Sequence, residues 1–165
     1  MRNNILNLLP FTGKQIFSRL TFTFLIAAQS IAARNVEITQ FGAVGDAATL
    51  NTKALQMAID TCAKTGGGEV TVPPGTYITG TIYLRSNVEL HLCRGSIIRG
   101  SYRNPEDYPT RSLIVADSIE NAGISGSGII DGNARHPEFQ KNYRLNDGKR
   151  PYAIYYKDCK RMSLR

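Results

Sequence analysis

Apolar residues at helical spacing mark one segment early in the chain. Four of them fall at i, i+3, i+4 and i+7 and so share one helix face: Leu55, Ala58, Ile59 and Cys62. Asn51 or Thr52 can cap the first turn through its side-chain oxygen. Lys64 suits the last turn, and the three glycines at 66–68 end the helix. The pattern predicts one amphipathic helix between about residues 51 and 65.

Alternation of apolar and polar residues predicts strands on both sides of this helix. Residues 36–41 (VEITQF) predict a short first strand, which the glycines that follow it end. After the helix, residues 69–73 (EVTVP) alternate as a strand and residues 73–77 (PPGTY) predict a turn. Residues 78–84 (ITGTIYL) then predict another strand. From the helix onward, the chain is predicted to form strands alone.

Beyond Ser86 the strand pattern repeats. Three segments align, namely residues 86–92 (SNVELHL), 120–126 (ENAGISG) and 160–165 (KRMSLR). Their inward apolar positions match in two sets: Val88, Ala122 and Met162, and then Leu90, Ile124 and Leu164. The spacing is 34 residues and then 40. Each unit opens with polar residues and continues with apolar residues two apart, as strands of a half-buried sheet do.

A second pair of segments repeats Ile-Ile-x-Gly at 97–100 and 129–132, which places Arg99 and Asp131 at matching positions. Insertions at 102–112 and 134–151 make the period irregular. Short strands at a loose period are typical of a β-solenoid, whose coils stack their apolar faces into one column. A β-sandwich is the alternative, but it leaves the helix unexplained, whereas the open first coil of a solenoid needs a cap.

Residues 1–32 differ from the rest of the 165 residues. They carry three basic residues and no acid, followed by the apolar run that starts at residue 20 (LTFTFLIAAQSIAA), with small residues near Ala32. This is typical of a secretory signal peptide, and the run is too short and too polar for a membrane anchor. We therefore expect a secreted or periplasmic protein with cleavage near Ala32, a domain from 33 to 165, and no membrane span after cleavage.

The charge and the cysteine content argue against a nucleic-acid partner and against a zinc site formed by cysteines. The whole chain holds 20 Lys and Arg residues against 13 Asp and Glu, so without the three basic residues before position 33 the excess falls to 17 against 13. A mild, scattered excess argues against a nucleic-acid partner. Cys62, Cys93 and Cys159 match no zinc spacing, and any pairing among them stays open. Cys62 lies on the apolar helix face and is expected to be buried.

From residue 41 onward the chain resembles the opening of polygalacturonases, glycoside hydrolase family 28, within the pectate-lyase-like superfamily. The resemblance covers residues 36–165 and rests on Gly-Asp at 45–46, the helix, the three glycines and Pro-x-Gly-Thr-Tyr at 73–77, in that order. Residues 113–132 (LIVADSIENAGISGSGIIDG) and 150–156 (RPYAIYY) support the narrower family. One departure is Ala47, near which relatives usually place a glycine. The resemblance implies a right-handed parallel β-helix with an N-terminal capping helix, and metal-free hydrolysis of α-1,4-galacturonosyl linkages in pectin.

The catalytic motifs of that family do not occur in residues 33–165. Members carry Asn-Thr-Asp, Asp-Asp, Gly-His-Gly and Arg-Ile-Lys on later coils. Here Lys53 follows Asn51 and Thr52, no two aspartates adjoin, and neither His91 nor His136 has glycine neighbours. We therefore expect no catalytic residue, no metal site and no cofactor in this chain. The chain ends at Arg165 within an expected strand, so we expect it to be the first part of a longer hydrolase. By itself this part should be inactive and prone to aggregate.

Asp131, in residues 126–133 (GSGIIDGN), is the carboxylate for which a catalytic role and a turn-forming role must be compared. Inverting glycosidases need an acid and a base about 6.5–9.5 Å apart. The repeat gives Asp131 a basic partner, Arg99, so the carboxylate should stay ionised, and its place before Gly132 suits a turn. We predict that Asp131 turns a corner of the chain.

Other polar residues are weaker candidates. Glu106 and Asp107 lie between prolines and predict a solvated turn. Arg135, Lys141 and Arg144 in the second insertion could face a polyanion, although substrate-binding residues stay unknown.

Two other classes of protein stay open. One is a non-catalytic carbohydrate-binding or adhesive β-helix, and the other is a pectate lyase, which would need calcium held by clustered acids. The expected partner is a pectic polysaccharide, polygalacturonate or rhamnogalacturonan. The sequence leaves open endo or exo action, the substrate within that class and the oligomeric state.

Overall fold

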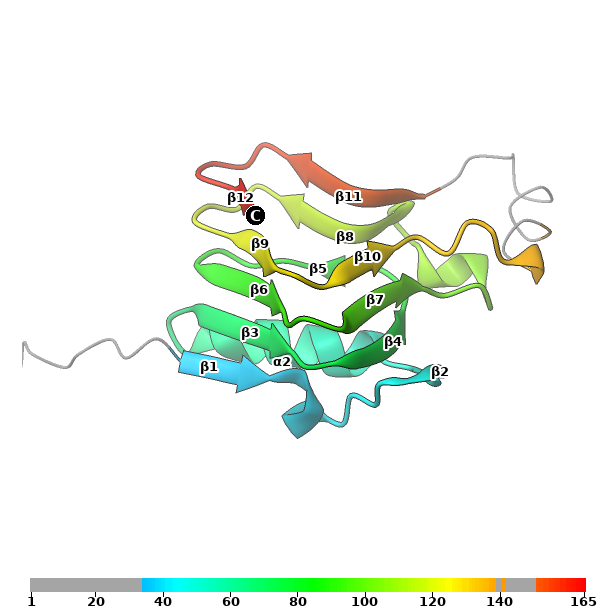
Figure 1. Ribbon diagram of the computed structural model, residues 1–165. Coiled ribbons are helices and arrows are strands. Elements are labelled where there is room, and N and C mark those ends of the chain that lie inside the picture. The colour runs from blue at the N-terminus through cyan, green and yellow to red at the C-terminus, as the bar shows by residue number, and fades with distance from the viewer. Residues whose placement is uncertain (1–33, 139–140, 142–150) are drawn as a thin grey trace, which may run out of the picture. The chain divides into compact units, whose positions relative to one another are not determined.

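The computed structural model describes residues 34–138, 141 and 151–165. The predicted signal peptide at residues 1–32 lies outside them. The described elements follow one another along the chain as shown in Figure 1: β1 (Arg34–Glu37), η1 (Ile38–Phe41), β2 (Asp46–Leu50), α2 (Thr52–Lys64), β3 (Gly68–Val72), β4 (Gly75–Thr79), β5 (Ile82–Tyr83), β6 (Val88–Leu92), β7 (Ser96–Gly100), η2 (Pro105–Asp107), β8 (Ser112–Asp117), β9 (Gly123–Gly126), β10 (Ile129–Asp131), β11 (Tyr152–Lys157) and β12 (Ser163–Leu164).

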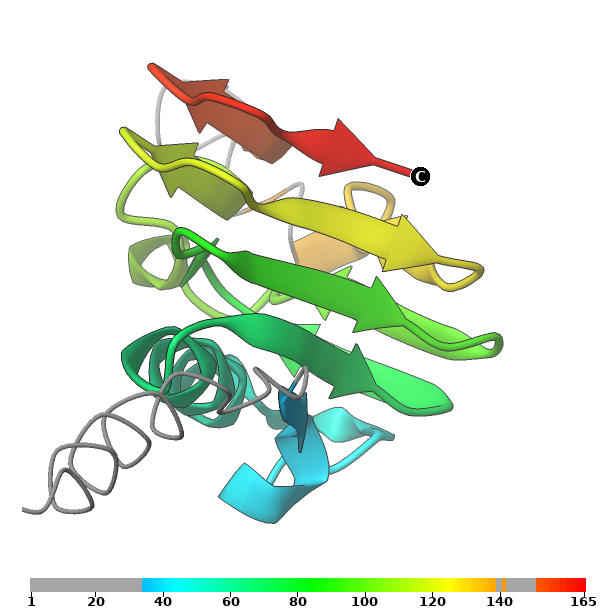
Figure 2. The same cartoon turned by 90° about the vertical axis from the view of Figure 1, so that its left-hand side faces the viewer.

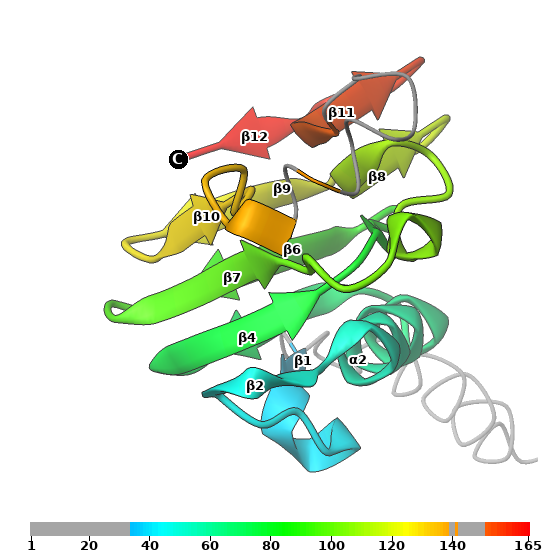
Figure 3. The same ribbon diagram turned by 90° about the vertical axis from the view of Figure 1, so that its right-hand side faces the viewer.

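Successive strands join different sheets, and the described strands pair in parallel. The sheets run β1-β3-β6-β9-β12, β10-β7-β4-β2 and β11-β8-β5. The first sheet faces the viewer in Figure 2 and the second in Figure 3. A chain that visits three sheets in turn and returns to the first makes one coil, so the fold is the predicted right-handed parallel β-helix. The β-sandwich is excluded, because it needs antiparallel strands in two packed sheets.

Strand register confirms the repeats found in the sequence. Leu90 pairs with Ile124, and Ile124 pairs with Leu164. In the second sheet, Ile97 and Ile98 pair with Ile129 and Ile130. Leu90 and Ile98 are fully buried, so stacked apolar side chains fill the inside of the column.

One corner of the coils explains why each repeat opens with a polar residue. The backbone at Asn87, Asn121 and Arg161 is left-handed, with φ of 63°, 53° and 52°. Asparagine tolerates this conformation better than most residues. The Asn121 side-chain amide also donates to Asn87 Oδ1 at 3.2 Å, and Arg161 Nε donates to Asn121 Oδ1 at 2.5 Å. A ladder of polar side chains therefore holds this corner.

The predicted helix is present as α2, and its apolar face is buried as expected. Leu55, Ala58, Ile59 and Cys62 are all fully buried. The Gly67 N–H donates to the Cys62 carbonyl at 2.9 Å and closes the helix end. A Cβ at Gly67 would meet the Asn87 carbonyl oxygen at 2.3 Å, so only glycine fits between the two coils. No described helix has the length and apolar character needed to cross a bilayer.

The predicted helix cap is wrong in its chemistry. Asn51 makes no side-chain cap bond to α2. Its amide accepts from the Val44 N–H at 2.7 Å and donates to the carbonyls of Val44 and Thr49 at 3.0 and 2.7 Å. The buried Asn51 thus holds the loop before the helix instead of capping the helix.

Side chains of α2 bind the edge of strand β5, which ends its sheet and has no neighbouring strand on that side. Gln56 Oε1 accepts from the Tyr83 N–H at 2.8 Å, and Gln56 Nε2 donates to the Tyr83 carbonyl at 3.1 Å. Thr52 Oγ1 accepts from the Gly80 N–H at 2.7 Å. Backbone groups at a sheet edge are otherwise unpaired, so α2 caps the first coil by replacing the missing strand.

Three strand predictions need correction. The first strand ends at Glu37, because residues 38–41 form the 3-10 helix η1. Strand β2 was not predicted; its residues are all exposed, so it shows no apolar alternation. Residues 75–77 belong to strand β4, and the predicted strand at 78–84 is divided by a corner at Gly80 and Thr81.

The departure at Ala47 has a structural consequence. Its φ is 60°, in the left-handed region that a glycine would occupy without strain. Asp46 holds this turn, because its carboxylate accepts from the N–H groups of Ala48 and Thr49 at 2.8 and 2.7 Å. These bonds lower the pKa of Asp46 to about 2.

We expect Ala47→Gly to raise the free energy of unfolding by about 0.5–1 kcal/mol, since relief of the left-handed strain exceeds the entropy of the added glycine. Urea denaturation measures the change. Ala48→Gly is the matched control, because Ala48 has no positive φ; it should lower stability by a similar amount. Equal effects of both substitutions would contradict the strain at Ala47.

We expect Gln56→Leu to lower the free energy of unfolding by about 1–2 kcal/mol, because it leaves the Tyr83 N–H and carbonyl without partners. The same variant should aggregate more readily, which light scattering would detect. Met57→Gln changes the exposed neighbouring residue and should shift stability by no more than about 0.5 kcal/mol. Stability of Gln56→Leu at or above that of the unaltered protein would rule out the edge-capping role.

Candidate functional site

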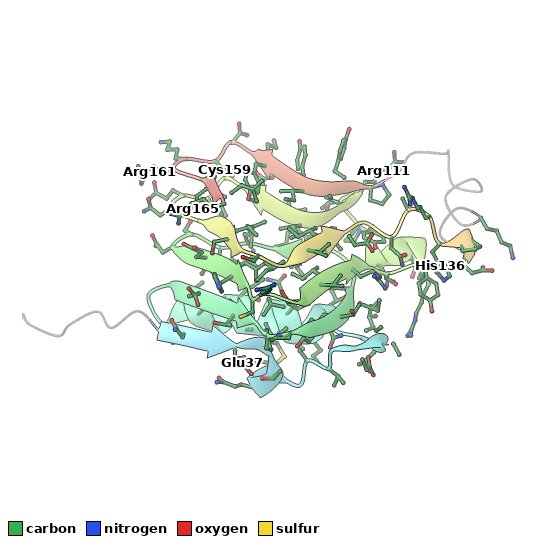
Figure 4. The ribbon with its side chains drawn as sticks, viewed as in Figure 1. Glu37, Arg111, His136, Cys159, Arg161 and Arg165 are labelled. Atoms are coloured by element: carbon green, nitrogen blue, oxygen red, sulfur yellow. The ribbon has the colours of Figure 1, made fainter. Side chains whose placement is uncertain are left out.

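The two insertions of the sequence leave neighbouring coils on the same side of the molecule. They follow β7 and β10, and both project at the right of Figure 1. The Tyr102 ring of the first insertion stacks on the His136 ring of the second, with centroids 3.8 Å apart and an interplanar angle of 15°. Figure 4 places His136 and Arg111 at this end of the molecule. The described parts of the two insertions, residues 102–112 and 134–138, therefore form one surface.

Asp131 lies beside this surface, at the end of strand β10. Its register partner is Arg99, as the repeat predicted. Arg99 Nε donates to Asp131 Oδ2 at 2.9 Å, and the two side chains are 33 % and 39 % exposed. Asp131 Oδ1 accepts from the Asn133 N–H at 2.8 Å. Both carboxylate oxygens are thus bonded to groups of the protein.

The residues after Asp131 form a small hollow. A cavity of about 390 Å³ is lined by residues 131–135. Asn133 has a left-handed backbone with φ of 54°, and its amide donates to the Gly100 carbonyl at 3.0 Å. Asp131 and Asn133 therefore join this corner to the coil below, which is the turn-forming geometry predicted for Asp131.

The prediction that Glu106 and Asp107 form a solvated turn is correct for Glu106 alone. Glu106 is exposed and accepts from an Asn104 amide N–H at 3.3 Å. Asp107 lies closer to the coil, and its carbonyl accepts from the Thr81 N–H at 2.7 Å. Its Oδ2 atom is buried, and among the described residues no donor reaches it. Asp107 packs closely against Gly80, where a Cβ would meet the Asp107 carbonyl oxygen at 2.3 Å.

The remaining candidates are dispersed. His91 Nδ1 lies 3.0 Å from Ser125 Oγ on the outer face of the first sheet, and His136 Nδ1 accepts from the Glu138 N–H at 3.3 Å. Arg135 lines the hollow at residues 131–135, and Lys141 is exposed. Arg144 lies outside the described residues.

The described residues contain no cluster that matches glycosidase or metal chemistry. Among residues 34–138, 141 and 151–165, the ion-pair partner of Asp131 is Arg99, and no other acid in these ranges lines the hollow at residues 131–135. No group of three His, Cys, Asp or Glu side chains within the described ranges could hold a metal ion. The three cysteines are free thiols, with burial raising the pKa of Cys62. The absence of a catalytic residue from the whole chain stays a prediction.

Sequence reasoning missed the Tyr102–His136 stack. The two rings come from insertions that align with no repeat, so no periodic pattern relates them. The only available signal was that both insertions follow the same strand position in successive repeats.

A family model described as "Rhamnogalacturonase A/epimerase, pectate lyase-like" matches residues 33–143. Among curated proteins, the "Exo-poly-alpha-D-galacturonosidase" of Dickeya chrysanthemi is 39% identical over 119 residues, which make up 59% of this chain and 19% of the relative. The chain thus spans about a fifth of the length of that relative.

Solved structures show the same similarity. A Parabacteroides merdae protein has a TM-score of 0.72 at 29% identity, over 79% of this chain and 62% of its own. The family 28 exopolygalacturonase of Yersinia enterocolitica has a TM-score of 0.65 at 28% identity, over 79% of this chain and 34% of its own.

We expect Asp131→Asn to lower the free energy of unfolding by less than about 1 kcal/mol, because the partly exposed ion pair contributes little and the amide still accepts from Asn133. Chemical denaturation measures this. Any hydrolytic activity of the protein should be unchanged. Arg99→Gln, which removes the same ion pair from the other side, is the control. Loss of activity by a factor of about 10³ in Asp131→Asn alone would make Asp131 catalytic.

Proposed function

Because the chain belongs to the rhamnogalacturonase A/epimerase, pectate lyase-like family, we propose that it forms the helix-capped first coils of a glycoside hydrolase that cleaves α-1,4-galacturonosyl linkages of pectin. The observation that carries this proposal is the 39% identity to a galacturonosidase over 119 residues. Similarity to an exopolygalacturonase structure at 28% identity supports it.

The role of this segment follows from how a β-helix builds a catalytic site. Coils repeat at roughly 4.8 Å, so acids on the same or neighbouring coils can lie at the roughly 6.5–9.5 Å that an inverting hydrolase needs. The described coils instead carry Asp131 opposite Arg99. We therefore propose that the catalytic acids lie on further coils. The helix-capped coils described here would support those coils and set their strand register.

The proposal includes the route to the substrate. Pectin is extracellular, and residues 1–32 have the composition of a secretion signal. We propose export to the periplasm or the exterior, with a pectic polysaccharide as the partner. Hydrolysis by two carboxylates needs no metal and no cofactor.

The test compares the 165-residue chain with the product of the complete reading frame in a reducing-sugar assay on polygalacturonate. We expect no turnover by the former and clear turnover by the latter, with saturated products whose new anomeric centre is inverted in NMR spectra. Unsaturated products that depend on calcium would instead indicate a lyase. Binding of polygalacturonate without turnover by the complete product would indicate an adhesive protein, and turnover by the 165-residue chain would refute its predicted inactivity.

A further inference from the structure

A row of side chains lies on the outer face of the sheet formed by β5, β8 and β11. Tyr83 pairs with Val115, and Val115 pairs with Tyr155, so the three occupy matching positions on adjacent strands. Ile82 and Ile114 are fully buried in the core. Side chains alternate between the two faces of a strand, so Tyr83 and Val115, the next residues, face outward.

This row is apolar, and it is accessible at the end formed by Tyr155. Val115 is only 4% exposed between its two aromatic neighbours, whereas Tyr155 is 41% exposed. Tyr152, on the same strand, is 65% exposed and stacks on Tyr155 with ring centroids 6.1 Å apart and an interplanar angle of 27°. Exposed aromatic side chains that contact each other on a strand are typical of interaction surfaces.

The row ends at a hollow beside helix α2. This cavity of about 430 Å³ has a mixed lining, with Leu50, Met57 and Tyr83 among its apolar residues and Lys53 and Asp60 among its charged ones. Leu50 and Met57 are 42% and 45% exposed. The hollow therefore offers apolar contacts and hydrogen-bonding groups together.

The charges along this face leave one cation unpaired. Asp60 binds Arg85 at 2.8 Å, and Asp117 lies 3.8 Å from Lys157. No carboxylate among the described residues forms an ion pair with Lys53, which lines the hollow. The face therefore has an unneutralised positive charge at one end and an aromatic surface along the rest, and it complements an acidic ligand that also has apolar faces.

We propose that the row of Tyr83, Val115, Tyr155 and Tyr152, together with the hollow at Lys53, is a docking platform for an acidic polysaccharide. The apolar faces of the sugar rings lie on the tyrosine rings, and one uronate lies near Lys53. Tyr83 and Tyr155 are two strands apart, or roughly 9.6 Å along the helix axis, a regular spacing that suits a linear polymer. The choice of a pectic chain as that polymer rests on the proposed function.

The test is affinity electrophoresis of the protein encoded by the complete reading frame, in gels that contain polygalacturonate. We expect Tyr155→Ala to weaken binding about tenfold, because it removes the exposed aromatic ring that contacts both Val115 and Tyr152 in the platform. Lys53→Gln should weaken binding about threefold, as loss of one exposed ion pair does. Tyr155→Phe and Lys53→Arg keep the ring and the charge and should bind like the unaltered protein.

Two controls separate the platform from general effects. Arg94→Gln removes an exposed cation from a turn on another side of the coil and should leave binding unchanged. Tyr152→Ala, at a more exposed position, replaces Tyr155→Ala if the latter fails to fold. Unchanged binding in the tyrosine-to-alanine variants, or an equal loss in Arg94→Gln, would overturn the platform.

Failure of the platform and failure of the proposed function are distinguishable. If the unaltered protein hydrolyses polygalacturonate but the platform variants bind it equally well, the platform is wrong and the function stands. If hydrolysis is absent but Tyr155→Ala and Lys53→Gln still lose binding, the platform stands and the hydrolase proposal fails. With activity present, the variants should raise KM for polygalacturonate and leave kcat unchanged, because the lost contact binds ground state and transition state alike.

Discussion

Parallel pairing between successive coils determines almost every other feature of this molecule. Each strand finds its hydrogen-bond partners one coil away, at roughly 4.8 Å, so residues at matching positions stack on one another. Inside the column this stacking aligns Leu90 with Ile124. At one corner it aligns Asn87 with Asn121, and on the surface it sets Arg99 against Asp131 and Tyr83 beside Val115. A shift of one residue would turn each of these side chains to the opposite face.

The same pairing leaves one strand edge without a partner strand, and helix α2 binds that edge. In the sheet of β5, β8 and β11 no strand lies below β5, so the outer backbone N–H and carbonyl groups of β5 have no strand partner. Gln56 offers one donor and one acceptor to Tyr83, as a neighbouring strand would. The buried apolar stripe fixes the helix against the column, and this places the amide of Gln56 at the correct height. Sequence periodicity predicts the apolar stripe, but it does not predict what a glutamine outside that stripe binds.

The sequence predicted those features that depend on repetition, and it missed those that depend on single contacts. The coil register, the helix and the Arg99–Asp131 pair follow from apolar residues at fixed spacing, and all three are confirmed. Strand β2 was missed because its exposed residues carry no alternation, and Asn51 was assigned the wrong role because its partners come from the preceding loop. Tyr83 and Tyr155 meet Val115 only through the fold, so no local pattern could join them into a surface.

The charges on these coils indicate why a catalytic pair would be placed elsewhere in such a fold. Several ion pairs here join side chains of adjacent coils, as in Arg99–Asp131, Lys157–Asp117 and Arg161–Glu120, whereas Glu69 and Glu89 are like-charged register partners on β3 and β6. A pair of glycosidase acids needs like charges at neighbouring heights, which repel each other and raise the pKa of one partner. That arrangement lowers stability, and the surrounding coils must offset it. Coils that carry a helix cap, an asparagine ladder and an ion pair in register at Arg99 and Asp131 are suited to supply this stability.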